Sequence, residues 1–170
     1  MLPSLYMIDE GTRGGFIAIM RRPSPEWLED DLSKLSEMGV HHILSLLTAE
    51  EVNELGLQAE PAASRACGIT FYSFPVQDRG TPDNETAFIE LIHKLSRAER
   101  AGHGVAVHCR AGIGRSGLAA AALLVSRGFD AAEAFDLISE RRRVTVPDTG
   151  IQKTWIRERA SALSSLSDEA

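Results

Sequence analysis

Residues 104–117 constrain the fold of this chain more than any other part of its sequence. They read GVAVH, then CRAGIG, then RSG, and a run rich in alanine and leucine follows up to Gly128. The short apolar stretch is typical of a buried strand, and the later run is typical of a helix. A glycine-containing loop at a helix start presents unpaired backbone N–H groups beside the positive end of the helix dipole. This junction therefore predicts a binding site for an anion.

Strands and helices alternate along the chain. Strand-like runs occur at Phe16–Met20, residues 40–46, residues 69–76 and Gly104–His108. Apolar spacing predicts helices at residues 25–38, 49–55, 82–101, 118–127 and 130–141, and a last helix that starts near Asp148. We expect an α/β fold in which helices flank a mostly parallel central sheet, with a β-α-β unit made by the first two strands. Ligands in such folds bind where strands end and helices begin, as at the loop after residue 108.

The size and charge of the chain limit its organisation and partners. A length of 170 residues fits one domain, which we expect to span residues 1–162, with residues 163–170 as a frayed tail. The formal net charge of −6 disfavours a general attraction to nucleic acid or anionic membranes. The longest apolar run, residues 118–125, is too short to cross a bilayer. We expect no nucleic-acid partner and no membrane insertion, and the oligomeric state stays open.

The cysteines and histidines give no sign of a disulfide framework or a metal site. Cys67 and Cys109 are the two cysteines of the chain, and free thiols suit a reducing compartment, so we expect a cytoplasmic protein. Neither cysteine has a partner at zinc-ligand spacing. The histidines outside the loop also lack ligand spacing, and we expect them on the surface or on helix faces; they are His41, His42, His93 and His103. We expect no metal and no cofactor.

Cys109 and Arg115 give the loop a specific chemistry. Helix N-termini and nearby cations favour the thiolate, which is the nucleophilic form of cysteine. The planar guanidinium of Arg115 can donate two parallel hydrogen bonds to a phosphoryl group. A lone cysteine at the end of a strand is more often a structural thiol, but Arg115 and Ser116 in register favour a nucleophile. The loop is therefore predicted to bind phosphate beside a reactive sulfur.

The run from His108 through Cys109 to Arg115 and Ser116, with five residues between the cysteine and the arginine, resembles the signature of cysteine-dependent protein tyrosine phosphatases. The size of the chain and its residues 39–54 and 75–83 are similar to the compact dual-specificity branch, particularly its kinase-associated-phosphatase-like members. The resemblance covers residues 14–157. It implies a phosphatase of phosphate monoesters, acting on phosphotyrosine with phosphoserine and phosphothreonine as further substrates.

The resemblance implies a role for each residue of the signature. Cys109 would attack phosphorus in line and form a phosphocysteine intermediate. Ser116 would hydrogen-bond the sulfur and help it leave, and His108 would orient the loop and tune the thiol. The implied phosphate-binding residues are Arg110, Ala111, Gly112, Ile113, Gly114 and Arg115.

A phosphatase of this kind also needs an acid, because expelling an alkoxide is costly. Asp78, in the loop after the third predicted strand, matches the acid position of the family. Asp83 and Asp148 are the alternatives, although Asp83 suits the first turn of a helix. Gln152 resembles the glutamine that positions the hydrolytic water in some relatives, while an exposed helical glutamine is the commoner explanation.

The sequence of the loop also allows other interpretations. The glycines at 112, 114 and 117 match the dinucleotide pattern G-x-G-x-x-G, but the expected next strand with an acidic end is missing. An inositol phosphate, a phosphoinositide or another non-protein phosphoester stays open as substrate. A catalytically silent phosphoprotein-binding module and a sulfur-transfer enzyme of the rhodanese kind fit less well.

Two further features have more than one interpretation. Arg141, Arg142 and Arg143 end a predicted helix, where cations complement the dipole, or they grip a second anionic group. Cys67 is expected to be structural, and a backup disulfide with Cys109 would need the two residues to lie close together.

Overall fold

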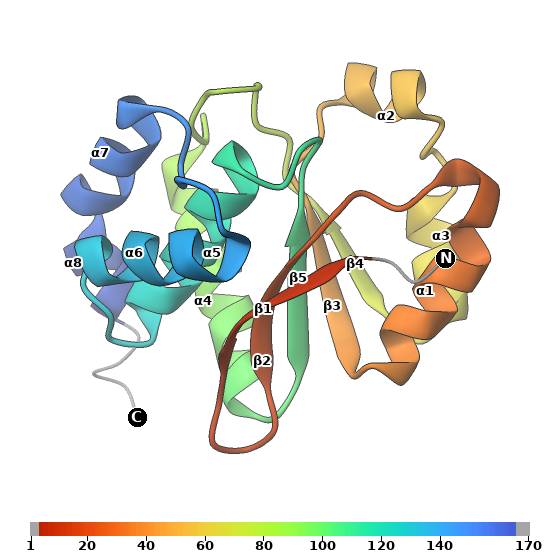
Figure 1. Cartoon of the computed structure of the whole chain (residues 1–170), viewed down its shortest axis with the longest axis horizontal. Helices are drawn as coiled ribbons and strands as arrows, with labels where there is room; N and C mark the ends of the chain where they lie inside the picture. Colours follow the sequence, from red (N-terminus) through yellow and green to blue (C-terminus); the bar gives the residue numbers. More distant parts are fainter. Residues whose placement is uncertain (1–3, 166–170) are drawn as a thin grey trace.

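The computed structural model describes residues 4–165 of the chain as one sheet with helices on both faces (Figure 1). The strands are β1 (Leu5–Glu10), β2 (Phe16–Met20), β3 (Val40–Ser45), β4 (Thr70–Ser73) and β5 (Gly104–His108). The helices are α1 (Leu28–Glu37), α2 (Ala49–Leu55), α3 (Glu60–Ala66), α4 (Glu85–Arg100), α5 (Gly114–Ser126), α6 (Ala131–Arg142), α7 (Gly150–Glu158) and α8 (Ala160–Ser164). The expected single α/β domain is confirmed.

Strand β5 occupies the centre of the sheet, whose order is β1-β2-β5-β3-β4. It pairs in parallel with β2 and β3, while β1 joins the edge antiparallel to β2. All five residues of β5 are buried, as a strand covered on both faces requires. The loop after β5 therefore opens between the carboxyl ends of two parallel neighbours. The expected β-α-β unit is present in split form, because β2 and β3 run parallel with α1 between them in sequence, but β5 is inserted between the two strands.

The core has two layers, one on each face of the sheet. Alternate side chains of a strand point to opposite faces, so β2 and β5 contribute to both layers. Helices α4 to α8 cover one face and α1 to α3 cover the other (Figure 1). Helix α5 packs between the sheet and α4, α6, α7 and α8, and each residue from Arg115 to Ser126 is buried. This position explains its alanine-rich composition, since small side chains allow neighbours on every side.

Several element boundaries differ from those expected. Strand β1 and helix α3 were not predicted, since neither has a strong apolar period. Helix α5 begins at Gly114 rather than at residue 118, which brings Arg115 and Ser116 into its first turn. Helix α4 begins after Asn84, whose side chain accepts the Ala87 N–H. Helix α8 runs through the start of the expected frayed tail and buries Leu163, and residues 166–170 of that tail lie outside the described part.

Three histidines meet at the amino end of β3 and β5; His41 is exposed, as expected, while His42 and His103 are half-buried. The rings of His41 and His103 stack at 4.5 Å, and those of His42 and His103 at 5.1 Å. His42 Nε2 lies 2.9 Å from His103 Nδ1. Burial, together with the charges of His103, His41 and Lys94, lowers the pKa of His42 to about 4.

The depressed pKa of His42 predicts a pH-dependent stability. Folding lowers the pKa of His42, so the folded protein holds this ring neutral. As the pH falls from about 6.5 toward 4, the unfolded chain takes up a proton that the folded protein does not, and the folded state loses stability. We expect the free energy of unfolding of the protein to decrease over that range, and His42→Gln to make the decrease shallower. Urea unfolding at several pH values measures this. His93→Gln is the control, and equal slopes for the protein and His42→Gln would contradict the prediction.

Candidate active site

The loop between β5 and α5 curls around the sulfur of Cys109. Cys109 follows directly after β5 and is 3% exposed. The Gly112 N–H donates to Cys109 Sγ at 3.3 Å. Gly112 has a φ of 74°, a left-handed conformation that favours glycine and turns the backbone back over the thiol. One member of the predicted ring of amides, the Gly112 N–H, therefore already points at the sulfur.

Two arginines hold this loop from outside. Arg22 donates to the Arg110 carbonyl at 2.9 Å, and Arg142 Nε donates to the Gly112 carbonyl at 2.9 Å. Arg142 also stacks over the Tyr6 ring at 3.9 Å. Because the C=O and N–H of a peptide unit point in opposite directions, carbonyls drawn outward leave the amides free to face inward. Arg142 thus supports the loop, a role that sequence reasoning missed because it depends on contacts distant in sequence.

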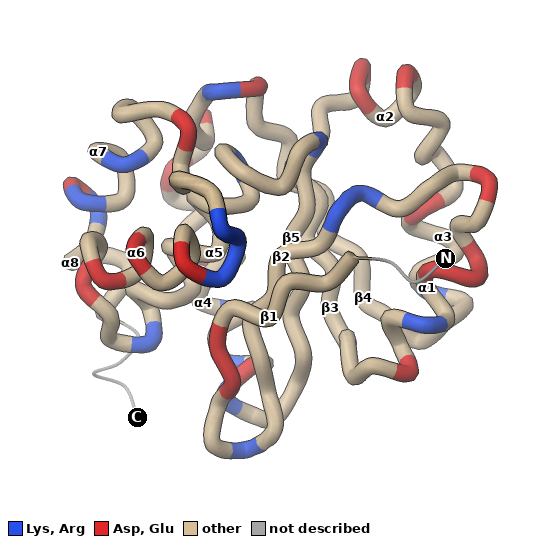
Figure 2. Tube along the Cα trace, in the orientation of Figure 1, with Lys and Arg blue, Asp and Glu red and all other residues tan. Residues whose placement is uncertain are grey.

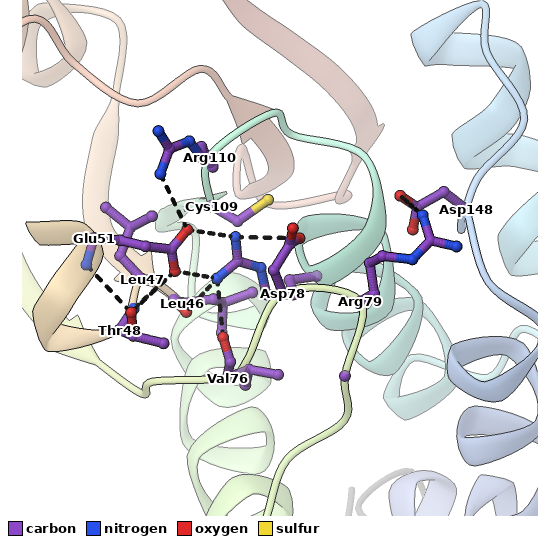
Figure 3. A network of polar contacts seen from close by, with 12 residues as sticks. Leu46, Leu47, Thr48, Glu51, Val76, Asp78, Arg79, Cys109, Arg110 and Asp148 are labelled. Atoms are coloured by element: carbon purple, nitrogen blue, oxygen red, sulfur yellow. Dashed lines mark hydrogen bonds and ion pairs between the residues drawn. The ribbon is translucent and has the colours of Figure 1, made fainter. Parts of the chain in front are cut away.

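Arg115 is buried and anchored on Glu51 by two parallel hydrogen bonds; Figure 3 labels Glu51 and shows the dashed lines that leave its carboxylate. Its Nη1 lies 2.6 Å from Glu51 Oε1, and its Nη2 lies 2.9 Å from Glu51 Oε2. Nη1 also donates to the Val76 carbonyl at 2.9 Å. The outer fork of the guanidinium, expected to face phosphate, is therefore occupied by a carboxylate. The Nε side of the guanidinium is the edge that remains for a ligand.

The pair of Arg115 and Glu51 shifts both ionisations toward the charged forms. The hydrogen bond from Arg115 lowers the pKa of Glu51 to about 2, against the opposing effect of burial. Burial opposes the charge of Arg115, but the hydrogen bonds to Glu51 and the charges of Cys109, Glu51 and Asp78 raise its pKa. Sequence reasoning missed Glu51. Its signal was present in the capping box that it forms with Thr48, which fixes it at the start of α2 beside the loop.

Asp78 lies on the loop after β4, beside the guanidinium. Its Oδ1 is 3.6 Å from Arg115 Nη2, and its side chain is 74% exposed (Figure 3). Asp148 pairs with Arg79 at 3.8 Å, and its Oδ1 would contact a Cβ placed at Gly114. The structure brings Asp78 and Asp148 to the loop from two sides. Asp83 is exposed just before α4.

Gln152 is fully buried in the first turn of α7, so the interpretation as an exposed helical glutamine is wrong. Its Nε2 donates to the Gly80 carbonyl at 3.0 Å, which ties α7 to the loop that carries Asp78. Its Oε1 would lie 3.1 Å from a Cβ at Gly114. The amide therefore sits between the loop of Asp78 and the loop of Cys109.

His108 ends β5 with its ring fully buried behind the loop. Its Nε2 lies 2.7 Å from Glu60 Oε1, and its Nδ1 lies 3.4 Å from the Cys109 carbonyl. Glu60 begins the unpredicted helix α3 and is 1% exposed. Unlike Glu51, it reaches the signature from a helix whose first turn shows no capping motif.

Several buried polar atoms at this site have no hydrogen-bond partner among the described residues. They are Arg115 Nε, Ser116 Oγ and Gln152 Oε1. The bond expected from Ser116 to the sulfur is not among the hydrogen bonds of residues 4–165, and Gly112 N–H takes that place. Buried polar groups in folded proteins are nearly always paired. Donors on Arg115 and Ser116 therefore indicate a site that accepts an anion next to Cys109.

The remaining expectations concern Arg110, the second cysteine, metal binding and membrane insertion. Arg110 is turned toward α2, where its Nη1 lies 3.1 Å from Glu54 Oε2. It also lies 3.9 Å from Glu51 Oε2, the contact drawn in Figure 3. Cys67 and Cys109 are free and pack in different core layers. Among residues 4–165 no group of three or more histidine, cysteine, aspartate or glutamate side chains could hold a metal ion. Within the same residues, each helix is too short or too polar to cross a bilayer.

Comparison with known sequences links this arrangement to a family. A family model described as Swiss Army Knife protein, DSP-PTPase phosphatase domain, matches residues 13–167. Human Dual specificity protein phosphatase 5 is 32% identical over 112 residues, which are 64% of this chain and 29% of that protein. Human Cyclin-dependent kinase inhibitor 3 is 29% identical over 98 residues, which are 58% of this chain and 46% of that protein. The chain thus spans less than half the length of these relatives.

Solved structures share the fold over nearly the whole chain. A kinase-associated phosphatase with serine in place of its catalytic-site cysteine superposes with a TM-score of 0.83 at 20% identity, covering 97% of this chain and 98% of that one. PTPMT1 superposes with a TM-score of 0.76 at 17% identity, covering 98% of this chain and 100% of that one.

The anchoring of Arg115 gives a stability prediction. Glu51→Gln should lower the free energy of unfolding at neutral pH by about 1–3 kcal/mol, because a buried guanidinium loses its charged acceptor. Since the pKa of Glu51 is depressed in the folded state, the contribution is present above about pH 4.5 and is lost as the pH falls toward 2. Urea unfolding at neutral and acidic pH measures both effects. The control is Glu50→Gln, an exposed neighbour, and an equal loss in both variants would contradict the prediction.

Proposed function

We propose that this chain, which belongs to the DSP-PTPase phosphatase family, is a cysteine-based phosphatase that hydrolyses phosphate monoesters through a phosphocysteine intermediate on Cys109, with Asp78 as the general acid. One observation carries the proposal. Buried donors without partners in residues 4–165, on Arg115 and Ser116, adjoin a sulfur that already accepts the Gly112 N–H. A phosphoryl group supplies acceptors for such donors, and its phosphorus is the natural target of the sulfur.

The first step forms a sulfur–phosphorus bond and breaks the ester bond. The Cys109 thiolate attacks phosphorus, while Arg115 Nε and the loop amides hold the equatorial oxygens. The guanidinium cannot swing away, because Glu51 and the Val76 carbonyl fix its other edge. Preorganised donors of this kind stabilise charge in the transition state without reorganising.

Asp78 is proposed to donate the proton that the leaving oxygen needs. Its exposed carboxyl group lies 3.6 Å from Arg115 Nη2, beside the proposed phosphate site. In the second step the same group, now ionised, would take a proton from water as the water attacks the phosphocysteine. Gln152, buried between the two loops, is placed to orient that water through its amide.

Phosphotyrosine is the proposed substrate group, with phosphoserine and phosphothreonine as further substrates. A second candidate is a phosphoester with additional negative charges, such as an inositol phosphate or a phosphoinositide. Basic residues favour it, because Arg22 and Arg142 flank the loop although the chain is acidic overall (Figure 2). PTPMT1, a structural neighbour, has been solved in complex with PI(5)P. Rates on phosphotyrosyl peptides and on soluble inositol phosphates discriminate between the two.

Replacing the nucleophile tests the proposed intermediate. We expect Cys109→Ser to reduce hydrolysis of an aryl phosphate by roughly a thousandfold or more, because a neutral hydroxyl replaces the thiolate. Release of p-nitrophenol from p-nitrophenyl phosphate measures the rate. Cys67→Ser is the matched control and should retain the activity of the unmodified protein. Substantial turnover by Cys109→Ser would remove the thiolate mechanism.

Comparing three carboxylates tests the proposed acid. We expect Asp78→Asn to slow hydrolysis of an alkyl phosphate by about 10²–10⁴-fold, and to slow an ester with a good leaving group less. Vanadate inhibition should persist in this variant, because the anion site is intact. Asp83→Asn should leave the rates unchanged. A larger loss in Asp148→Asn than in Asp78→Asn would reassign the acid to Asp148.

A further inference from the structure

We propose that Glu60 is a positioning residue of the reaction, which keeps the ring of His108 cationic behind the loop and thereby favours the Cys109 thiolate. The proposal rests on the nucleophilic role proposed for Cys109. It adds a second buried charge pair to the site, beside the pair of Arg115 and Glu51.

The contact between Glu60 and His108 is short and almost fully buried. Glu60 Oε1 lies 2.7 Å from His108 Nε2, and the two side chains are 2% and 0% exposed. A glutamate is rarely buried unless it is paired. Glu60 is brought to this place by helix α3, which begins with it and packs in the layer opposite to α5. The pair therefore joins the carboxyl end of the central strand to an element of the other layer.

The hydrogen-bond partners of the His108 ring determine which of its two nitrogens are protonated. An ionised carboxylate and a peptide carbonyl are acceptors only, and a neutral imidazole has one donor. His108 faces an acceptor at both nitrogens, Glu60 Oε1 at Nε2 and the Cys109 carbonyl at Nδ1. When Glu60 is ionised, both contacts are hydrogen bonds only if both nitrogens carry protons. The ring is then an imidazolium, and the carboxylate of Glu60 balances its charge.

A cationic ring at this position acts on the adjacent thiol. The Nδ1 of His108 lies 3.4 Å from the Cys109 carbonyl in a buried region, so a charge on the ring favours the thiolate of that residue. Among the described residues, Arg115 from α5 also interacts with Cys109, and Arg115 in turn pairs with Glu51 from α2 and Asp78 from the loop after β4. Because both ring nitrogens are protonated, His108 takes no proton when Cys109 ionises, and that proton leaves to solvent.

The pH profile of thiol alkylation tests the proposal without any phosphatase substrate. The rate of Cys109 alkylation by iodoacetamide, followed by mass spectrometry, is compared at a mildly acidic and a mildly alkaline pH. We expect Glu60→Gln to lower the acid-to-alkaline ratio of rates about tenfold, because a neighbouring cation is lost. Glu99→Gln, which removes another buried carboxylate, should leave the ratio unchanged.

Testing Glu60→Gln in a His108→Asn variant distinguishes an effect that acts through His108 from a general loosening of the fold. His108→Asn should lower the same ratio, and adding Glu60→Gln to it should cause no further change. Independent, additive losses in the double variant would overturn the proposal. An unchanged ratio in folded Glu60→Gln would overturn it as well.

A spectroscopic measurement decides the matter if Glu60→Gln does not fold. Nitrogen-15 NMR of the histidine-labelled protein at neutral pH reports the protonation of each ring nitrogen. The proposal requires both nitrogens of His108 to be protonated, and a ring with one protonated nitrogen would overturn it. Neither the alkylation nor the NMR measurement needs turnover. A failure of the proposed function would show instead as an active Cys109→Ser variant, so the two failures are distinguishable.

Discussion

The buried guanidinium of Arg115 is the group on which the rest of the site depends. A charge 2% exposed is stable only because its hydrogen bonds replace those of water, and Glu51 and the Val76 carbonyl supply them. Glu51 comes from the start of α2, and Val76 comes from the loop between β4 and Asp78. One side chain thus connects helix α5, helix α2 and the loop of the proposed acid, and fixes how they face Cys109.

Long-range contacts give the site a rigidity that the loop alone does not have. Arg22 and Arg142 hold the loop carbonyls, Gln152 reaches the Gly80 carbonyl, and Glu60 meets His108. Each contact joins segments far apart in sequence at the carboxyl edge of the sheet. The site therefore depends on the complete fold. Its arginines place positive charge around the loop, although the net charge of the whole chain is −6.

The loop itself was predictable from sequence because its chemistry is local. A strand, glycines and a helix start within residues 104–117 determine both the backbone and the positions of Cys109 and Arg115. The mostly parallel sheet followed from alternating periodicity. The central place of β5 between β2 and β3 did not follow, since the order of strands in space is set by packing. The contacts of Glu51, Glu60 and Arg142 did not follow from sequence, because glutamates and arginines at helix ends usually face solvent and only the fold shows that these are buried or paired. The capping box places Glu51 at a helix start but does not show that it reaches Arg115.

A crystal structure of the protein with vanadate tests most directly the claim that one sulfur, one guanidinium and a ring of amides bind a phosphoryl group. We expect the vanadium beside Cys109 Sγ, with oxygens within hydrogen-bond distance of Arg115 Nε and of the loop N–H groups, while Arg115 keeps both bonds to Glu51. Vanadate bound away from the loop, with Cys109 unchanged among its apolar neighbours, would contradict the account.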